Sequence, residues 1–178
     1  LLVGESWVVH STEIKGLVSY DVSRGETAGQ KFISAIEGAG ANVVHITNEA
    51  ACEGFPEDLQ SLKKYAVIVF SDVASDTLLL SRKTCRECQT RENPLELVRQ
   101  YVAEGGGFCM IGGHVSFQGY QGIANYRNTI LAQLLPVDML PGDDRVEGPQ
   151  GVRPYPRMAH HVLDGLQGEW PVYLGYNR

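Results

Sequence analysis

Two side chains near the middle of the sequence could act as nucleophiles. Cys109 lies in the apolar run 108–111, and Ser116 lies a few residues further on, after a Gly-Gly-His turn. A thiol or hydroxyl attacks a carbonyl carbon readily when a neighbouring base takes its proton, and His161 is the candidate base. If folding brings His161 to either nucleophile, these residues form a hydrolytic or amide-transfer site.

Each of these residues also has a structural explanation. A thiol inside an apolar strand is usually a small core side chain, so Cys109 is expected to be buried. Ser116 and His114 could form a hydrolytic pair, but a packed or solvent-exposed turn is favoured for both. His161 could instead cap a helix or pack against a loop, because a base has no catalytic role without its nucleophile.

Polar residues follow two predicted strands and form a second set of candidates. The carboxylates of Glu5 and Asp72 could bind a polar ligand or a metal, or they could anchor loops through hydrogen bonds. Neither explanation is favoured over the other. The residues expected to line one ligand-binding crevice are Glu5, Ser6, Trp7, Ser71, Asp72, Gly112, Gly113 and His114.

Cys85 and Cys88 have the CxxC spacing of zinc and redox sites. A zinc site normally needs four ligands, and no second CxxC is present, so a histidine or Cys52 would have to complete it. The motif does not follow the first strand, so the thioredoxin arrangement is not expected. A surface pair without metal is favoured, and no metal site is predicted.

Short apolar runs alternate with helical patterns along the chain, and polar loops separate them. The expected strands are 1–4, 42–47, 66–70, 108–111, 137–140 and 173–177. The expected helices are 27–39, 59–65, 93–102 and 129–135. The expected loops are 5–12, in which His10, Ser11 and Thr12 are site candidates, and 141–156. This alternation predicts a doubly wound, mostly parallel α/β sheet with its crevice at the carboxyl ends of the strands.

Composition limits the class of protein and its partners. The 178 residues fit one domain, 1–178, and 43% hydrophobic and 20% charged residues are typical of a folded globular chain. The net charge of -6 argues against nucleic acid as a partner, and no apolar run approaches the roughly 20 residues that span a membrane. Scattered cysteines favour the cytoplasm. No cofactor is predicted, because no phosphate-loop pattern follows a strand.

Several sequence blocks resemble the class I glutamine amidotransferase-like family of uncharacterised bacterial proteins. The most specific blocks are Gly105-Gly106-Gly107-Phe108-Cys109-Met110-Ile111-Gly112-Gly113 and Ser116-Phe117-Gln118-Gly119. The supporting blocks are 3–7, 71–72, 135–137, 143–145, 169–171 and 174–177. Together they cover nearly the whole chain. The resemblance implies a flavodoxin-like fold with further strands, and strand-like sequence at both ends leads us to expect a chain truncated at both ends.

The resemblance also implies where a nucleophile would stand. Class I amidotransferases place a cysteine on the tight turn after this strand, but here the turn carries Gly112 and Gly113. Glycine cannot attack an amide, so we expect a chain without glutaminase activity that binds a small polar molecule or a protein partner at the crevice. The alternative is an active amidotransferase or hydrolase that uses Cys109 or Ser116 with His161. A homo-oligomer is a further expectation.

Overall fold

A four-stranded parallel sheet forms the centre of the computed structural model, which describes residues 1–166 and 168–178. Its strands are, in spatial order, β4 (His45–Ile46), β1 (Leu2–Gly4), β5 (Val67–Ser71) and β6 (Gly107–Ile111). The register places Leu2 beside His45 on one side and beside Val69 on the other. Because β4 and β5 flank β1, the winding reverses between β1 and β5. This topology confirms the doubly wound, flavodoxin-like α/β prediction.

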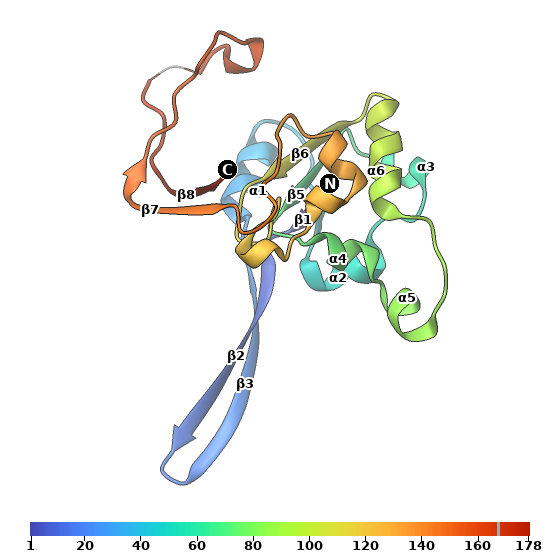
Figure 1. Ribbon diagram of the computed structural model, residues 1–178, viewed down its shortest axis with the longest axis vertical. Helices are drawn as coiled ribbons and strands as arrows, with labels where there is room; N and C mark the ends of the chain where they lie inside the picture. Colours follow the sequence, from blue (N-terminus) through green and yellow to red (C-terminus); the bar gives the residue numbers. More distant parts are fainter. Residues whose placement is uncertain (167) are drawn as a thin grey trace.

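Helices connect the strands and cover the sheet (Figure 1). They are α1 (Gln30–Gly38), α2 (Asn48–Gly54), α3 (Leu59–Leu62), α4 (Ser75–Leu79), α5 (Arg82–Glu87) and α6 (Pro94–Ala103). Short 3-10 helices are η1 (Tyr120–Gly122), η2 (Tyr126–Asn128), η3 (Ile130–Gln133) and η4 (His161–Leu163). The predicted start of α6 is confirmed, because Asn93 accepts hydrogen bonds from the backbone N–H groups of Leu95 and Glu96 at 2.9 and 3.4 Å.

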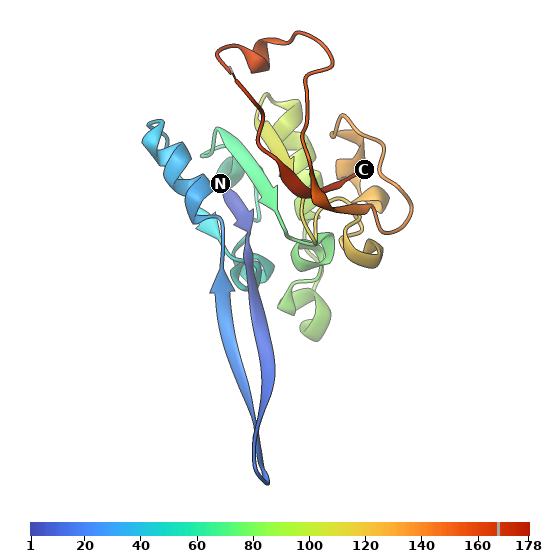
Figure 2. The same ribbon diagram turned by 90° about the vertical axis from the view of Figure 1, so that its left-hand side faces the viewer.

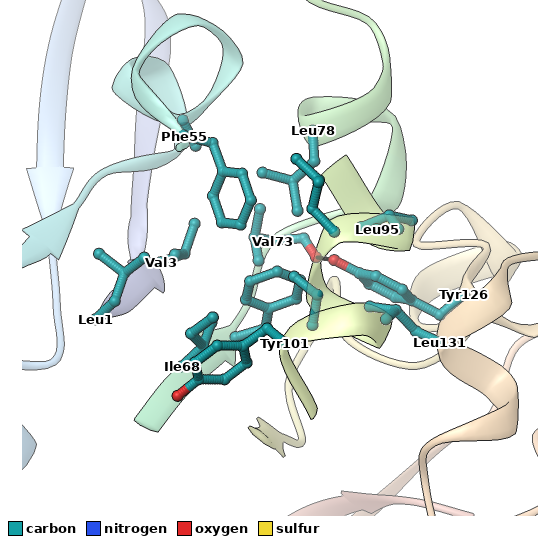
Figure 3. Close-up of a cluster of buried hydrophobic side chains, with 14 of the residues drawn as sticks. Leu1, Val3, Phe55, Ile68, Val73, Leu78, Leu95, Tyr101, Tyr126 and Leu131 are labelled. Atoms are coloured by element: carbon teal, nitrogen blue, oxygen red, sulfur yellow. Dashed lines mark hydrogen bonds between the residues drawn. The ribbon is translucent and has the colours of Figure 1, made fainter. Parts of the chain in front are cut away.

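The main core lies between one face of the sheet and the helices α2, α4 and α6 (Figure 3). Alternate strand residues, among them Val3, Ile68 and Phe70, point into it. The Phe70 ring meets Tyr126, whose fully buried hydroxyl donates a 2.8 Å hydrogen bond to the carbonyl oxygen of Val73. This bond satisfies a polar group that would otherwise be costly to bury.

The opposite face of the sheet is only partly covered. Helix α1 lies on this side and has no fully buried residue. Val67 is 45% exposed, so the apolar run 66–70 is not buried on both faces. Cys109 is exposed on the same face, so its predicted core position is wrong. Its neighbours Phe108 and Met110 pack on the main core, and strand alternation turns Cys109 away from them.

The residues after β1 form a long hairpin instead of the expected loop. β2 (Ser6–Lys15) and β3 (Val18–Thr27) pair along their whole length, and the ribbon projects away from the sheet (Figures 1 and 2). Gly16, at the turn, has a φ of +64° that favours glycine. His10, Ser11 and Thr12 therefore lie along an exposed arm, and the prediction that they lie in a loop is wrong. The first helix accordingly begins at Gln30.

A second hairpin replaces the loop expected over 141–156. β7 (Arg145–Val152) pairs with β8 (Tyr173–Asn177), which confirms the strand-like character of the last residues. Between them the chain extends away from the sheet and carries η4 (Figure 1). Residues 137–140 form no strand, because the Met139 carbonyl accepts a hydrogen bond from Arg127 Nε at 3.1 Å instead of a neighbouring strand.

Candidate functional site

Hydrogen bonds join the carboxyl ends of β1 and β5, where the winding of the sheet reverses. Gly4 has a φ of +107°, and a Cβ there would lie 1.9 Å from the carbonyl oxygen of Ser71, so only glycine fits. The Glu5 backbone N–H donates to that same oxygen at 3.0 Å, and the Ser71 hydroxyl donates to the Glu5 carboxylate. Glu5 and Ser71 thus bond to each other across this edge.

Ser6 ties the base of the first hairpin to α2. Its hydroxyl donates to Glu49 at 2.8 Å and accepts from the Asn48 N–H at 2.7 Å. The Asn48 side chain donates to the carbonyl oxygens of Ser6 and Asp72, at 2.7 and 2.9 Å. Hydrogen bonding from Ser6 lowers the pKa of the Glu49 carboxyl below its ordinary value. Trp7 lies on the hairpin, outside this group of hydrogen bonds, and is 42% exposed.

Asp72 and Ser116 anchor the loop that follows β6. Asp72 has a φ of +50°, and its Oδ1 accepts a hydrogen bond from the Val115 N–H at 2.5 Å. The Asp72 N–H donates to Ser116 Oγ at 3.0 Å, and Ser116 is only 2% exposed. A left-handed conformation in a non-glycine residue is held only where the surroundings fix it, and these two bonds do so.

Gly112 and Gly113 form the elbow after β6, and Asn177 occupies the space beside them. The Asn177 Oδ1 accepts from the Gly113 N–H at 2.9 Å, and its Nδ2 donates to the Gly113 carbonyl at 3.2 Å. A Cβ on Gly112 would lie 2.8 Å from Asn177 Oδ1, and a Cβ on Gly113 would lie 2.9 Å from Asp72 Oδ1. The elbow is therefore packed against two polar side chains.

Asp144 holds the elbow, its loop and β8 together. This carboxylate is 1% exposed and accepts hydrogen bonds from the N–H groups of Gln118 and Gly119, at 2.9 and 2.8 Å. A third bond comes from Asn177 Nδ2 at 2.8 Å. A buried carboxylate with several donors is well compensated. Sequence reasoning assigned no such role to Asp144 or Asn177, and only the acidic pair at 143–144 gave a local signal.

A cleft of about 680 Å³ opens between the elbow and the second hairpin. Its lining is mostly apolar, with polar groups from both sides. The lining residues are Ile111, Gly112, Gly113, His114, Arg145, Val146, Glu147, Val152, Pro154, Tyr173, Gly175, Tyr176 and Asn177. A concave site of this size with few polar groups is typical of small-molecule binding.

Arg145 and His114 form a polar wall of this cleft. Arg145 binds both carboxylate oxygens of Asp143, at 3.1 and 3.0 Å, and lies 4.7 Å from the centre of the Tyr120 ring. These bonds hold the pKa of Asp143 well below its ordinary value. The Arg145 Nη1 lies 3.0 Å from His114 Nδ1, whose ring stacks on Tyr120. A guanidinium only donates, so His114 Nδ1 accepts and its proton is on Nε2.

The three candidate catalytic residues lie on different parts of the molecule. Ser116 is buried below the elbow, and Cys109 is exposed on the sheet face away from the main core. His161 is exposed on η4, in the segment between β7 and β8, and its neighbour His160 caps that helix by accepting from the Val162 N–H at 3.2 Å. None of the three lines the cleft. Partial burial raises the pKa of the Cys109 thiol, which disfavours the nucleophilic thiolate.

Within residues 1–166 and 168–178, no group of three or more histidine, cysteine, aspartate or glutamate side chains is placed to hold a metal ion. Cys85 and Cys88 lie at the end of α5 and are both exposed. No helix in this described part of the chain has the length and apolar character needed to cross a membrane.

Two solved structures from Salmonella typhimurium resemble the chain closely, and no curated protein matches it. The cytoplasmic protein STM3548 is 38% identical with a TM-score of 0.93, and the match covers 99% of this chain and 72% of that one. The cytoplasmic protein STM1381, from strain LT2, is 40% identical with a TM-score of 0.89 and the same coverage. A family model described as "Putative glutamine amidotransferase" matches residues 1–178. The chain therefore belongs to this glutamine amidotransferase-like family.

Proposed function

We propose that this family member has no glutaminase activity and binds a small polar ligand in the cleft beside the elbow. The packing of the elbow carries the first part of the proposal. The Cβ of any residue at position 112 would begin 2.8 Å from Asn177 Oδ1, a separation that real Cβ atoms essentially never show. The same oxygen accepts the Gly113 N–H, a donor that could otherwise stabilise an oxyanion. Asn177 thus occupies the space that a nucleophilic side chain at position 112 would need. It also binds the N–H group that an oxyanion would need.

The composition of the cleft supports the second part. The Nε2–H of His114 is a hydrogen-bond donor, and Glu147 supplies an acceptor at the wall. Tyr173 and Tyr176 add aromatic surface that is about half exposed. Arg145 is already paired with two carboxylates, Asp143 and Glu147, so its charge is compensated. These groups suit an uncharged polar ligand, such as a polyol or an amide, better than an anion.

Ammonia release from L-glutamine tests the catalytic part of the proposal. The wild-type chain should release no more ammonia than a buffer control. A Cys109→Ser variant should have the same rate, since that thiol is on another face of the sheet. Sustained release by the wild type that disappears in Cys109→Ser or Ser116→Ala would overturn the proposal and support the active-enzyme alternative with His161 as base.

Thermal unfolding in the presence of candidate ligands tests the binding part. A panel of polyols, free amino acids and amides should contain compounds that raise the melting temperature, because a ligand that binds only the folded state stabilises it. The increase should be lost in His114→Ala, which removes the cleft donor, and kept in Lys64→Ala, which changes an exposed residue outside the cleft. Equal increases in both variants would contradict binding in this cleft.

We also propose that the first hairpin mediates association of two copies of the chain. Its tip exposes Ile14, Leu17 and Val18, which are 72%, 105% and 62% exposed. Apolar residues gathered at the end of a projecting ribbon are typical of an interaction surface. Sedimentation should show a dimer that dissociates in Leu17→Asp but not in Glu13→Gln. A monomeric wild type at high concentration would refute this role of the arm.

A further inference from the structure

Two exposed thiols lie at the end of helix α5, outside the cleft and the elbow. Cys85 is in the last turn of α5, and Cys88 is the residue that ends the helix. Both belong to the segment that connects α4 to α6 on the outside of the molecule (Figure 1). The function proposed above uses neither of them.

The spacing of these two cysteines along α5 is compatible with a disulfide after a local adjustment. Residues three apart on a helix have Cβ atoms about 5–6 Å apart, and a disulfide needs about 3.5–4.5 Å. Cys88 has already left the helix, with a φ of +52°, so its side-chain direction is set by the chain end and not by a continuing helix. The Cys85 Sγ lies 3.6 Å from the carbonyl oxygen of Leu80, so bond formation requires this side chain to turn away from that oxygen and the last turn of α5 to adjust.

Helix α5 is free to make such an adjustment. None of its residues is buried. It is held at its start by the Ser81 hydroxyl, which accepts from the Thr84 N–H at 3.2 Å, and by Glu53, which accepts from the Arg82 N–H at 2.5 Å. These bonds lie at the N-terminal end, away from Cys88. Movement at the other end disturbs no core packing.

Positive charge surrounds the pair. Arg82, Lys83 and Arg86 lie on the same six-residue helix, against a single carboxylate, Glu87. Positive charge near the pair attracts an anionic low-molecular-weight disulfide, such as oxidised glutathione. Cys52 on α2 is close enough to Cys85 to interact with it electrostatically, but it is half-buried, and burial raises the pKa of its thiol. The exposed pair is therefore more accessible to a small disulfide than Cys52 is.

We propose that Cys85 and Cys88 form a reversible disulfide by exchange with a low-molecular-weight disulfide. The thiolate of one cysteine attacks the small disulfide, forms a mixed disulfide and releases one small thiolate. The second cysteine, as its thiolate, attacks the protein sulfur of that mixed disulfide and releases the other small thiol. Two protein thiols are oxidised and one small disulfide is reduced to two thiols. An exposed disulfide in so short a loop is easily reduced again, which suits a regulatory modification in a reducing compartment.

Peptide mapping of the whole chain after exposure to oxidised glutathione tests this proposal. Arg86 lies between the two cysteines, so trypsin separates peptide 84–86 from peptide 87–91. After oxidation these peptides should appear joined, with two hydrogens lost, and dithiothreitol should separate them. Cys85→Ser and Cys88→Ser should each instead accumulate a glutathione adduct on the remaining cysteine. Cys109→Ser and Cys52→Ser should leave the joined peptide unchanged.

Three outcomes would overturn the proposal. One is a stable glutathione adduct on the wild type without the joined peptide, which would mean that the second thiol cannot attack. Another is a joined peptide that contains Cys52 in place of Cys88. The last is protection of both thiols from alkylation by zinc alone, which would make the pair part of a metal site. None of these readouts depends on glutaminase activity or on the cleft.

Discussion

Asn177 connects parts of the chain that are far apart in the sequence. Its amide oxygen accepts from Gly113, and its amide nitrogen donates to Gly113 and to Asp144. The side chain uses its donor and its acceptor ends at once, so neither aspartate nor leucine can replace it without loss. The geometry of the elbow therefore depends on one residue of β8, and Asp144 fixes the position of that residue.

Replacing Asp144 with asparagine should weaken the fold. The carboxylate accepts three hydrogen bonds, and an amide would turn its NH₂ group toward at least one of these donors. A buried donor without an acceptor costs about 1–3 kcal/mol, so the free energy of unfolding should fall by about that amount. Urea unfolding measures it. Asp138→Asn, at an exposed carboxylate of the preceding loop, is the control and should change the midpoint little; equal effects would contradict the role of Asp144.

Adding a methyl group at the elbow should also be destabilising. In Gly112→Ala the new Cβ would lie 2.8 Å from Asn177 Oδ1, which its own hydrogen bonds hold in place. Overpacking of this kind costs about 1–3 kcal/mol. Gly142→Ala is the matched control, because nothing lies within 4 Å of its Cβ position. Thermal unfolding should separate the two variants, and a Gly112→Ala protein as stable as the wild type would show that Asn177 moves aside freely.

The sequence predicts the residues of this site that lie at strand ends, but not the two side chains that hold the elbow in place. The Gly112-Gly113 turn stands out because it follows an apolar strand directly, and Glu5 and Asp72 stand out because they end strands. Asn177 and Asp144 are missed because their bonding depends on tertiary folding that brings positions 33 residues apart together. The burial of Cys109 is predicted wrongly because apolar neighbours indicate a strand but not which of its faces is covered.

At the scale of elements, neither hairpin is predicted from the sequence, and the reasons differ. The first has a detectable signal, since β-branched and aromatic residues flank Gly16 on both sides. The second is hidden by Gly148, Pro149 and Gly151 inside β7, and its partner strand begins only after a long excursion. Three of the parallel strands and α6 are predicted well, because their patterns and caps are local, whereas the strand expected over 42–47 is only His45–Ile46.

In the Leu17→Asp variant, which should be monomeric, the first hairpin should exchange its amide hydrogens much faster than the sheet. A two-stranded ribbon without a packed face is at best marginally stable in water, so it opens without unfolding of the whole chain. Its distal half, around Gly16, carries exposed side chains on both faces. Hydrogen exchange followed by mass spectrometry should give rapid exchange there and slow exchange in β5, whose neighbours are β1 and β6. Equal protection in the hairpin and β5 of this variant would contradict the expectation that the isolated arm opens by itself.

At the scale of the whole molecule, several carboxyl groups favour the folded state only while they are ionised. Hydrogen bonds lower the pKa of each of them below its ordinary value. The four groups are Glu49, Asp58, Glu96 and Asp143. A pKa that is lower in the folded state means that the unfolded chain binds more protons in acid. Their stabilising contribution is therefore full above the ordinary value and is lost as the pH falls through the lowered one.

Stability should accordingly decrease as the pH is lowered from about 5 toward 3, since the ordinary pKa values of aspartate and glutamate lie near 4. Glu49 is the most informative of the four groups, because it lies in α2 and accepts a hydrogen bond from Ser6, at the base of the first hairpin. Glu49→Gln should lower the melting temperature at pH 7 and make its decrease in acid less steep. Glu37→Gln, on the exposed surface of α1, should leave the slope unchanged. If Glu49→Gln kept the full acid slope, protonation of Glu49 would not contribute to acid unfolding, and the loss of stability would have to come from the other carboxyl groups.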